Sequence, residues 1–194
     1  MDDVLGYEGK HALVTGAASG MGEATAALLV ELGARVTALD VKTVEVPGVE
    51  SRQVDLRDPA SIDAAVEGIG PVDALFSVAG LPGPPFSDLD VLKVNFIGAR
   101  HLVEAVLPTM PSGSAVACVA SNAGLGWQLE YDSLFPLVSS ASFDEAVAWV
   151  EENPEGLNAN MGYLYSKKVM NAWVAWRAPQ LIAAQGVRLN NTNP

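Results

Sequence analysis

The chain has 194 residues, and its 23 aspartates and glutamates outnumber its 11 lysines and arginines, which gives a net charge of -12 at pH 7. Such acidity repels phosphate groups and anionic lipids, which argues against nucleic acid or a membrane as a partner. No apolar run approaches the roughly 18 residues of a membrane span. The length suits a single domain over residues 1–194 with a substantial core.

Cysteine content and the N-terminus bear on the cellular compartment. The one cysteine, Cys118, lies in an apolar run that predicts a buried strand, so no disulfide can form within the chain. The first residues, 1–3, lack the basic start of a signal peptide. These features favour a reducing environment, and we expect a cytoplasmic protein.

Short apolar runs alternate along the chain with longer helical patterns. Strands are predicted near 11–15, 34–39, 51–54, 72–78, 114–120 and 187–190, and helices near 20–32, 59–68, 88–107 and 161–185. This alternation predicts an α/β fold, a parallel sheet covered by helices. Pro179 lies inside the last helical pattern and is expected to kink or end that helix.

A glycine cluster follows the first predicted strand: residues 15–22 have the sequence TGAASGMG and precede an alanine-rich helix. A glycine at the first position permits a tight strand-to-helix turn. The two later glycines allow the backbone to approach a pyrophosphate and the first strand, while the helix N-terminus offers free N–H groups to the anion. The segment therefore predicts a nucleotide cradle. Its expected contacts are Gly16, Ser19, Gly20, Met21 and Gly22.

Asp40 ends the second predicted strand. A carboxylate at this place can accept hydrogen bonds from both adenosine ribose hydroxyls and repels a 2'-phosphate. Residues 17–19 are neutral, and Lys42 is the one nearby compensating charge. The pattern predicts NAD in preference to NADP. The alternative is that Asp40 only caps a turn.

Tyr163 and Lys167 lie four residues apart, on one face of the last predicted helix. Phenolate is scarce at neutral pH, and a cation one helical turn away stabilises it electrostatically. This pair therefore suits proton transfer to and from an oxygen. Tyr165 has Val169 four residues further on instead of a cation, so we expect it to be a packing residue.

The combination of T-G-x-x-x-G-x-G with Y-x-x-S-K resembles the short-chain dehydrogenase/reductases over nearly the whole chain, from His11 to Pro194. The resemblance implies a Rossmann-like doubly wound parallel sheet in three α/β/α layers, with Tyr163 as the acid/base catalyst. Ser121 would hydrogen-bond the substrate oxygen, and Asn95 would hold a water that connects Lys167 to solvent. The alternatives are a turn-forming serine and a buried structural asparagine.

The same resemblance implies further cofactor contacts. Asp55 and Leu56 would flank the adenine, with the Asp55 carboxylate receiving its amine. Ala79 and Gly80 would close the floor of the site near the ribose and pyrophosphate. Tyr163 and Lys167 would also contact the nicotinamide ribose. The neighbouring Lys168 is expected to be solvated.

Two departures from the common family pattern point to one branch. The segment between Gly80 and Asn95 is short and proline-rich, and an acidic insertion occupies about 125–160, where Ser142 to Glu145 has the form of a capping box. Both features resemble the bacterial 3-alpha-hydroxysteroid dehydrogenase/carbonyl reductase and coniferyl-alcohol dehydrogenase branch. Relative to that family we expect the C-terminal strand and helix to be missing.

These observations predict an NAD-dependent oxidoreductase that interconverts an alcohol and a carbonyl on a small hydrophobic substrate, such as a hydroxysteroid or coniferyl alcohol. By resemblance it would be a homo-oligomer, a dimer or tetramer. His11 and His101 stand alone, so no metal is expected. The alternative function is a nucleotide-binding or interaction protein without turnover. The aromatic residues of the insertion, which either cover the substrate or pack, are Trp127, Tyr131, Phe135 and Trp149.

Overall fold

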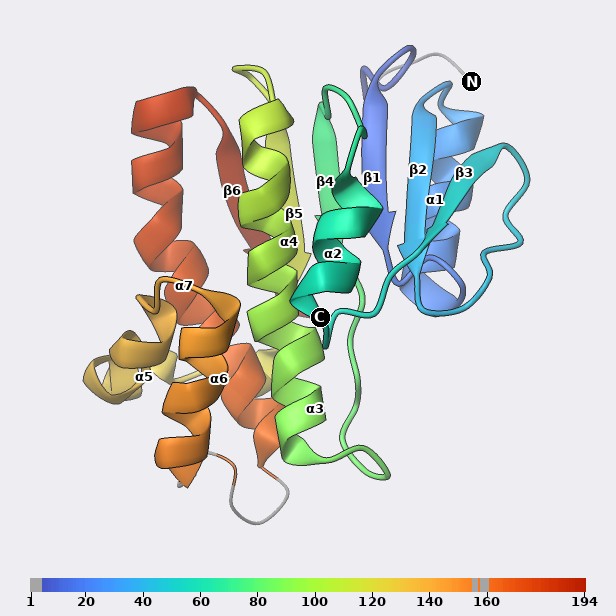
Figure 1. The fold of residues 1–194 in the computed structure, drawn as a ribbon. Coiled ribbons are helices and arrows are strands. Elements are labelled where there is room, and N and C mark those ends of the chain that lie inside the picture. The colour runs from blue at the N-terminus through green and yellow to red at the C-terminus, as the bar shows by residue number, and fades with distance from the viewer. Residues whose placement is uncertain (1–4, 155–156, 158–160) are drawn as a thin grey trace.

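A computed structural model describes residues 5–154, 157 and 161–194 of the chain. It contains a six-stranded parallel sheet in the order β3-β2-β1-β4-β5-β6 (Figure 1). The strands are β1 (His11–Thr15), β2 (Arg35–Asp40), β3 (Val49–Gln53), β4 (Ala74–Ser77), β5 (Ala115–Val119) and β6 (Arg188–Thr192). The predicted doubly wound α/β sheet is confirmed. The chain reverses its direction across the sheet between β1 and β4, which creates a crevice at their carboxyl ends.

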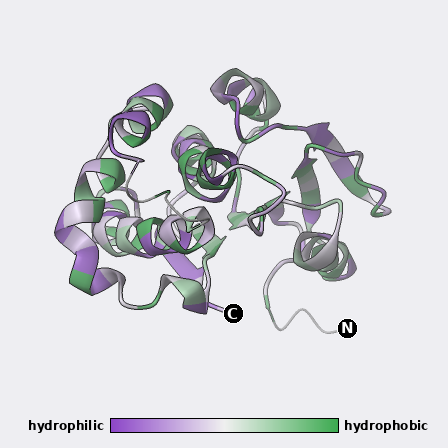
Figure 2. Ribbon diagram, turned by 90° about the horizontal axis from the view of Figure 1, so that it is seen from below, coloured by the Kyte–Doolittle hydropathy of each residue, from purple (hydrophilic) through white to green (hydrophobic). Residues whose placement is uncertain are grey.

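Helices cover both faces of this sheet. The α-helices are α1 (Gly20–Glu31), α2 (Pro59–Val66), α3 (Asp88–Leu92), α4 (Gly98–Val106), α5 (Tyr131–Val138), α6 (Phe143–Glu152) and α7 (Gly162–Gln185). In Figure 1, α2, α4 and α7 lie in front of the sheet and α1 lies behind it. In Figure 2 the helices carry both hydrophilic and hydrophobic residues, as expected for helices with one buried side. No helix in the described ranges has the length and hydropathy to cross a membrane.

The alternation of side chains along β1 divides the core into two parts. All five residues of β1 are buried, and successive side chains point to opposite faces of a strand. Ala12 and Val14 therefore pack under α1, while Leu13 joins the larger core beneath α4 and α7. In that larger core the rings of Phe96 and Trp173 meet edge to face at 6.4 Å. A central strand that is buried on both faces fixes the position of the loop that follows it.

The helix predicted near 88–107 is interrupted. A π-helical turn, η1 (Lys93–Ile97), separates α3 from α4, and a short 3-10 turn, η2 (Leu107–Thr109), follows α4. The hydrophobic pattern did not reveal this change because a π turn shifts the register by only one residue. π turns occur often at functional sites, and this one contains Asn95.

Pro179 does not end α7, contrary to one of the two outcomes predicted for it. The helix continues to Gln185 and stops at Gly186, which has a left-handed φ of 69°. The capping box predicted in the insertion begins a helix, α6. The Ser142 hydroxyl accepts a hydrogen bond from the Glu145 amide at 3.1 Å. Helix α5 was not predicted, and positions 155–156 and 158–160 of the insertion lie outside the described residues.

A buried arginine attaches the insertion to the rest of the domain. Arg100 on α4 is only 5% exposed. Its guanidinium donates to the carbonyls of Leu137, Ser140 and Ser142 and to the Ser140 hydroxyl, and it lies 5.5 Å from the centre of the Phe96 ring. Burial lowers the pKa of Arg100. The junction between α5 and α6 is thereby held against α4.

Gly98 lets α4 touch the segment that follows β3. A Cβ atom at this position would overlap the carbonyl oxygen of Leu56. Alanine is normally preferred to glycine in a helix by about 1 kcal/mol, but overpacking costs about 1–3 kcal/mol. We expect Gly98→Ala to lower the free energy of unfolding by about 2 kcal/mol in urea denaturation. An unchanged or higher stability would contradict this close contact.

Candidate active site

The glycine loop between β1 and α1 lies directly against the segment that follows β4. Gly16 has a left-handed φ of 71°, and a Cβ atom there would come within 2.7 Å of the Ala79 Cα. A Cβ atom at Gly22 would overlap the Gly16 carbonyl. Two of the predicted glycines are therefore required by contacts between backbone segments. A Cβ atom at Gly20 would meet no atom within 4 Å, so this part of the loop is open on its outer side.

Thr15 joins the two strands on either side of the crevice. Its hydroxyl accepts hydrogen bonds from the Val78 amide at 3.0 Å and the Ala79 amide at 3.1 Å, and the residue is fully buried. This function was missed from the sequence, although Thr15 is the first residue of the glycine motif. The bonds hold the Ala79–Gly80 segment against the glycine loop.

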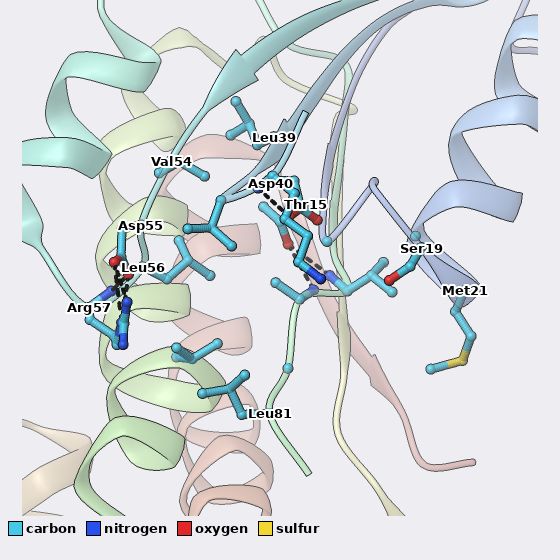
Figure 3. A pocket seen from close by; sticks show the side chains of 18 of the residues that line it. Thr15, Ser19, Met21, Leu39, Asp40, Val54, Asp55, Leu56, Arg57 and Leu81 are labelled. Atoms are coloured by element: carbon cyan, nitrogen blue, oxygen red, sulfur yellow. Dashed lines mark hydrogen bonds and ion pairs between the residues drawn. The ribbon is translucent and has the colours of Figure 1, made fainter. Parts of the chain in front are cut away.

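A cavity of about 460 Å³ lies along the carboxyl ends of β1, β2 and β4 (Figure 3). Many predicted cofactor residues line it: Gly16, Ser19, Met21, Gly22, Asp40, Asp55, Leu56, Ala79 and Gly80. The remaining lining residues include the aliphatic Leu39, Val54 and Leu81. Gly20, Tyr163 and Lys167 are not among the residues that line it. The Lys167 Nζ would lie 3.9 Å from a Cβ atom at Gly80, so the ammonium is next to one end of the cavity.

The Asp40 carboxylate connects the end of β2 to the glycine loop. One oxygen accepts a hydrogen bond from the Ala18 amide at 3.0 Å, and the other accepts from the Lys42 amide at 2.9 Å. The bond to Lys42 is the turn cap proposed as the alternative role. A carboxylate has about four acceptor sites, so these two bonds fix its orientation while leaving acceptor sites for further donors. Figure 3 places this side chain at the cavity wall.

Asp55 has a partner that the sequence analysis did not identify. Arg57 donates to both carboxylate oxygens, with the shortest contact from Nη2 to Oδ2 at 2.7 Å. The Arg57 guanidinium holds the pKa of Asp55 below its usual range. Arg57 itself lines the cavity (Figure 3). An adenine amine approaching Asp55 would therefore compete with Arg57 for the carboxylate oxygens. In the sequence, the D-x-R spacing of Asp55 and Arg57 could have indicated this ion pair.

Lys167 is a buried cation next to Tyr163, the tyrosine of the same Y-x-x-S-K motif. It is 4% exposed, and its Nζ lies 5.5 Å from the centre of the Tyr163 ring. The ammonium donates a hydrogen bond to the Val119 carbonyl at 2.8 Å. Burial lowers the pKa of Lys167 to about 8, so it is about nine-tenths protonated at pH 7. Two of its three donors are left for other acceptors.

Asn95 uses its side chain to join three segments. Its Oδ1 accepts from the Leu81 amide at 2.7 Å, and its Nδ2 donates to the Leu81 carbonyl at 3.0 Å and to the Ser166 hydroxyl at 3.1 Å. The Ser166 hydroxyl donates in turn to the Tyr163 carbonyl at 2.7 Å. The buried structural bond considered as an alternative is therefore present. It links the segment after β4 to the turn that carries Tyr163.

Ser121 follows β5 and begins a short 3-10 turn, η3 (Asn122–Gly124). Its hydroxyl accepts a hydrogen bond from the Ala123 amide at 3.2 Å, the turn-forming role considered as an alternative, and the residue is 8% exposed. This turn packs against α7: a Cβ atom at Gly124 would lie 2.7 Å from the Lys167 carbonyl oxygen. Ser121 and the Tyr163–Lys167 turn are thus brought to the same end of the sheet.

Lys168 is not the solvated side chain that the sequence predicted. It forms an ion pair with Glu130, and only 19% of its side chain is exposed. Glu130 belongs to another 3-10 turn of the insertion, η4 (Trp127–Glu130). The pair therefore ties the insertion to α7.

The aromatic residues of the insertion pack mainly on α7. The rings of Trp127, Tyr131, Phe135 and Trp176 follow one another at centroid distances of 5.5 to 6.1 Å. Together with Gln128 and Ala175, three of them line a second cavity of about 360 Å³, which shares no lining residue with the first. Trp149 packs on the main core. Packing, one of the two predicted roles, is therefore observed for these rings.

His11 and Cys118 have structural roles in the core. His11 bonds the Pro71 carbonyl and the Thr37 hydroxyl through its two ring nitrogens. Burial raises the pKa of the Cys118 thiol to about 12, so it is neutral at ordinary pH. Across residues 5–154, 157 and 161–194, no three His, Cys, Asp or Glu side chains gather in a group that could hold a metal ion.

Comparison with known proteins yields matches over most of the chain. A family model described as short chain dehydrogenase matches residues 10–131. The coniferyl-alcohol dehydrogenase of a Pseudomonas species is 32% identical over 95% of this chain and 72% of its own length. The 3-alpha-hydroxysteroid dehydrogenase/carbonyl reductase of Comamonas testosteroni is 29% identical over 94% of this chain and 70% of its own length.

A solved structure has the same fold. The 3-alpha-hydroxysteroid dehydrogenase from Pseudomonas sp. B-0831, crystallised with NADH, superposes with a TM-score of 0.74 at 22% identity, covering 95% of this chain and 72% of its own. At this level of identity the similarity concerns the fold.

The burial of Lys167 predicts a pH-dependent stability. The ordinary lysine pKa is 10.5, whereas the pKa of Lys167 in the folded protein is about 8. Between these values the unfolded state binds more protons, so stability rises with pH. We expect the free energy of unfolding, relative to Lys167→Met, to rise by about 3 kcal/mol from pH 7 to pH 10.5 in urea denaturation. A difference that does not change with pH would contradict the effect of burial.

Proposed function

The chain belongs to the short-chain dehydrogenase family, and from this membership we propose that it is an NAD-dependent oxidoreductase that interconverts an alcohol and a carbonyl group. The observation that carries the proposal is the buried Lys167 ammonium, 5.5 Å from the centre of the Tyr163 ring. A buried cation costs free energy, and its placement beside a phenol suits acid/base chemistry on an oxygen.

The chain's residues fit a dinucleotide. The glycine loop leaves open space at Gly20, and α1 begins there, so its free N–H groups can receive a pyrophosphate. The Asp40 carboxylate, oriented by two backbone amides, suits the adenosine ribose. Leu39, Val54 and Leu56 offer an apolar surface for the adenine. When bound, the nicotinamide would accept the hydride from an alcohol or deliver it to a carbonyl.

Within this proposal, Tyr163 takes a proton from the substrate hydroxyl or returns one to the carbonyl oxygen. The Lys167 cation stabilises the phenolate form, and its remaining donors are available for the nicotinamide ribose hydroxyls. Ser121 hydrogen-bonds the substrate oxygen, where charge develops. Asn95 acts through position: its side-chain bonds hold Leu81 and the Ser166 hydroxyl. Both donors of that side chain are occupied, so a water leading to Lys167 would donate to an acceptor, which is the second lone pair of Oδ1 or a backbone carbonyl.

The substrate we propose is a small hydrophobic alcohol or ketone. The relatives are named for coniferyl alcohol and for 3-alpha-hydroxysteroids, which both combine an apolar ring system with an alcohol group. The acidic side chains of the insertion, such as Glu130 and Asp132, would repel polyanionic substrates. The homo-oligomer stays a prediction of the family resemblance.

Replacing Tyr163 by phenylalanine tests the acid/base assignment. We expect the variant to lose NADH formation from NAD by at least about 10²-fold on a panel of hydroxysteroids and aromatic alcohols, because the proton acceptor is gone. NADH binding, followed by fluorescence, should change by less than about threefold. Tyr165→Phe is the matched control on the same helix and should keep its turnover. Equal loss of binding and turnover in Tyr163→Phe would oppose the assignment.

Asp40→Ala tests the preference for NAD. We expect the dissociation constant for NADH to rise about 10- to 100-fold, because hydrogen bonds to a charged group contribute about 1.5–3 kcal/mol. NADPH binding should not weaken, since the carboxylate that repels the 2'-phosphate is removed. Asp132→Ala makes the same charge change on the insertion and serves as the control. An unchanged NADH to NADPH affinity ratio in Asp40→Ala would refute the role of this carboxylate.

A further inference from the structure

A buried amide lies one helical turn beyond Lys167 and belongs to none of the motifs. Asn171 on α7 is 6% exposed. Its Nδ2 donates to the Gly124 carbonyl at 3.2 Å, and its Oδ1 accepts from the side-chain amide of Asn191 on β6. A side-chain amide can donate and accept at the same time. Asn171 therefore connects the turn after β5, the helix and the neighbouring strand.

The turn after β5 is held closely on the helix at this point. A Cβ atom at Gly124 would overlap the Asn171 amide and lie 2.7 Å from the Lys167 carbonyl oxygen. The Gly124 amide donates to the Ser121 carbonyl at 2.9 Å, and the Ala123 amide donates to the Ser121 hydroxyl at 3.2 Å. The position of Gly124 is thus transmitted through one turn to the Ser121 side chain.

β6 holds the other side of the same turn. Asn191 is paired in register with Cys118 on β5, and the Ala120 amide donates to the Thr192 carbonyl at 2.9 Å. Without Asn171, the buried Gly124 carbonyl and the half-buried Asn191 amide would each lose a partner, which is unfavourable, most of all for the buried carbonyl. Only a group that donates to one and accepts from the other satisfies both.

We propose that Asn171 is a positioning residue that sets the Ser121 hydroxyl relative to Lys167 and Tyr163 on the same helix. The inference rests on the proposed function, because it assigns Ser121 to the substrate oxygen. Lys167 and Asn171 stand on adjacent turns of one rigid helix, so a clamp on Gly124 fixes the distance between the hydroxyl and the acid/base pair. Small displacements of such groups lower turnover strongly.

The test is a double-mutant cycle on kcat with Asn171→Ala, Ser121→Ala and the combined variant. We expect Asn171→Ala to lower kcat about 10- to 100-fold while the dissociation constant for NADH stays within about twofold. In the Ser121→Ala background the same change should lower kcat by less than about twofold, because the hydroxyl it positions is gone. Gln180→Ala, an exposed amide on α7, is the control and should behave like the native protein. An equal loss in both backgrounds would overturn the proposal.

Two further measurements keep the proposal testable if Asn171→Ala folds poorly or if no alcohol is oxidised. Asn191→Ala leaves the bond from Asn171 to Gly124 in place and should lower kcat less, by about three- to tenfold. Hydrogen exchange needs no turnover: Asn171→Ala should speed exchange of the Ala123 and Gly124 amides but not of the Gly16 amide, which bonds the Leu39 carbonyl. Unchanged exchange at Gly124 would overturn the positioning role, whereas absence of turnover in the native protein with faster exchange would oppose only the proposed function.

Discussion

Three contacts between backbone segments, each of which excludes a side chain, determine the shape of the candidate site. Gly16 lies against Ala79, Gly98 against Leu56, and Gly124 against the turn of α7 that begins at Lys167. They bring the segments that follow β1, β3, β4 and β5 together with two helices at one edge of a parallel sheet. A parallel sheet places its carboxyl ends there in any case, but the missing Cβ atoms set how closely they approach.

Two charged groups are added to this frame. The Asp40 carboxylate at the cavity wall carries a negative charge that two backbone amides orient, and Lys167, next to one end of the cavity, is a buried cation held by the Val119 carbonyl. Burial of a cation opposes folding, as the lowered pKa of Lys167 indicates. Near Lys167, Asn95 joins the segment after β4 to the helical turn that carries Tyr163, because it bonds both Leu81 and Ser166.

The strands and the glycine loop were predictable because they depend on local patterns: apolar runs and a turn that needs glycine. Other features depend on partners far along the chain. The carbonyls that Arg100 bonds lie 37 to 42 residues away. Every residue has a backbone carbonyl, so the sequence does not indicate which ones an arginine will bond. The bonds of Asn95 similarly reach Leu81, 14 residues away, and the ion pair of Lys168 reaches Glu130, 38 residues away in the insertion. Roles for single side chains were inferred from the resemblance, whereas their competing structural bonds became visible only in three dimensions.

The central claim is that this chain moves a hydride between an alcohol carbon and a nicotinamide. The most direct measurement incubates the protein with NAD and alcohols deuterated at the carbinol carbon, drawn from hydroxysteroids and aromatic alcohols, and analyses the nicotinamide by mass spectrometry. The account predicts NADH that carries the deuterium and a carbonyl product in equal amount. Binding of NAD with no deuterium transferred from any of these alcohols would contradict it and favour a nucleotide-binding protein without turnover.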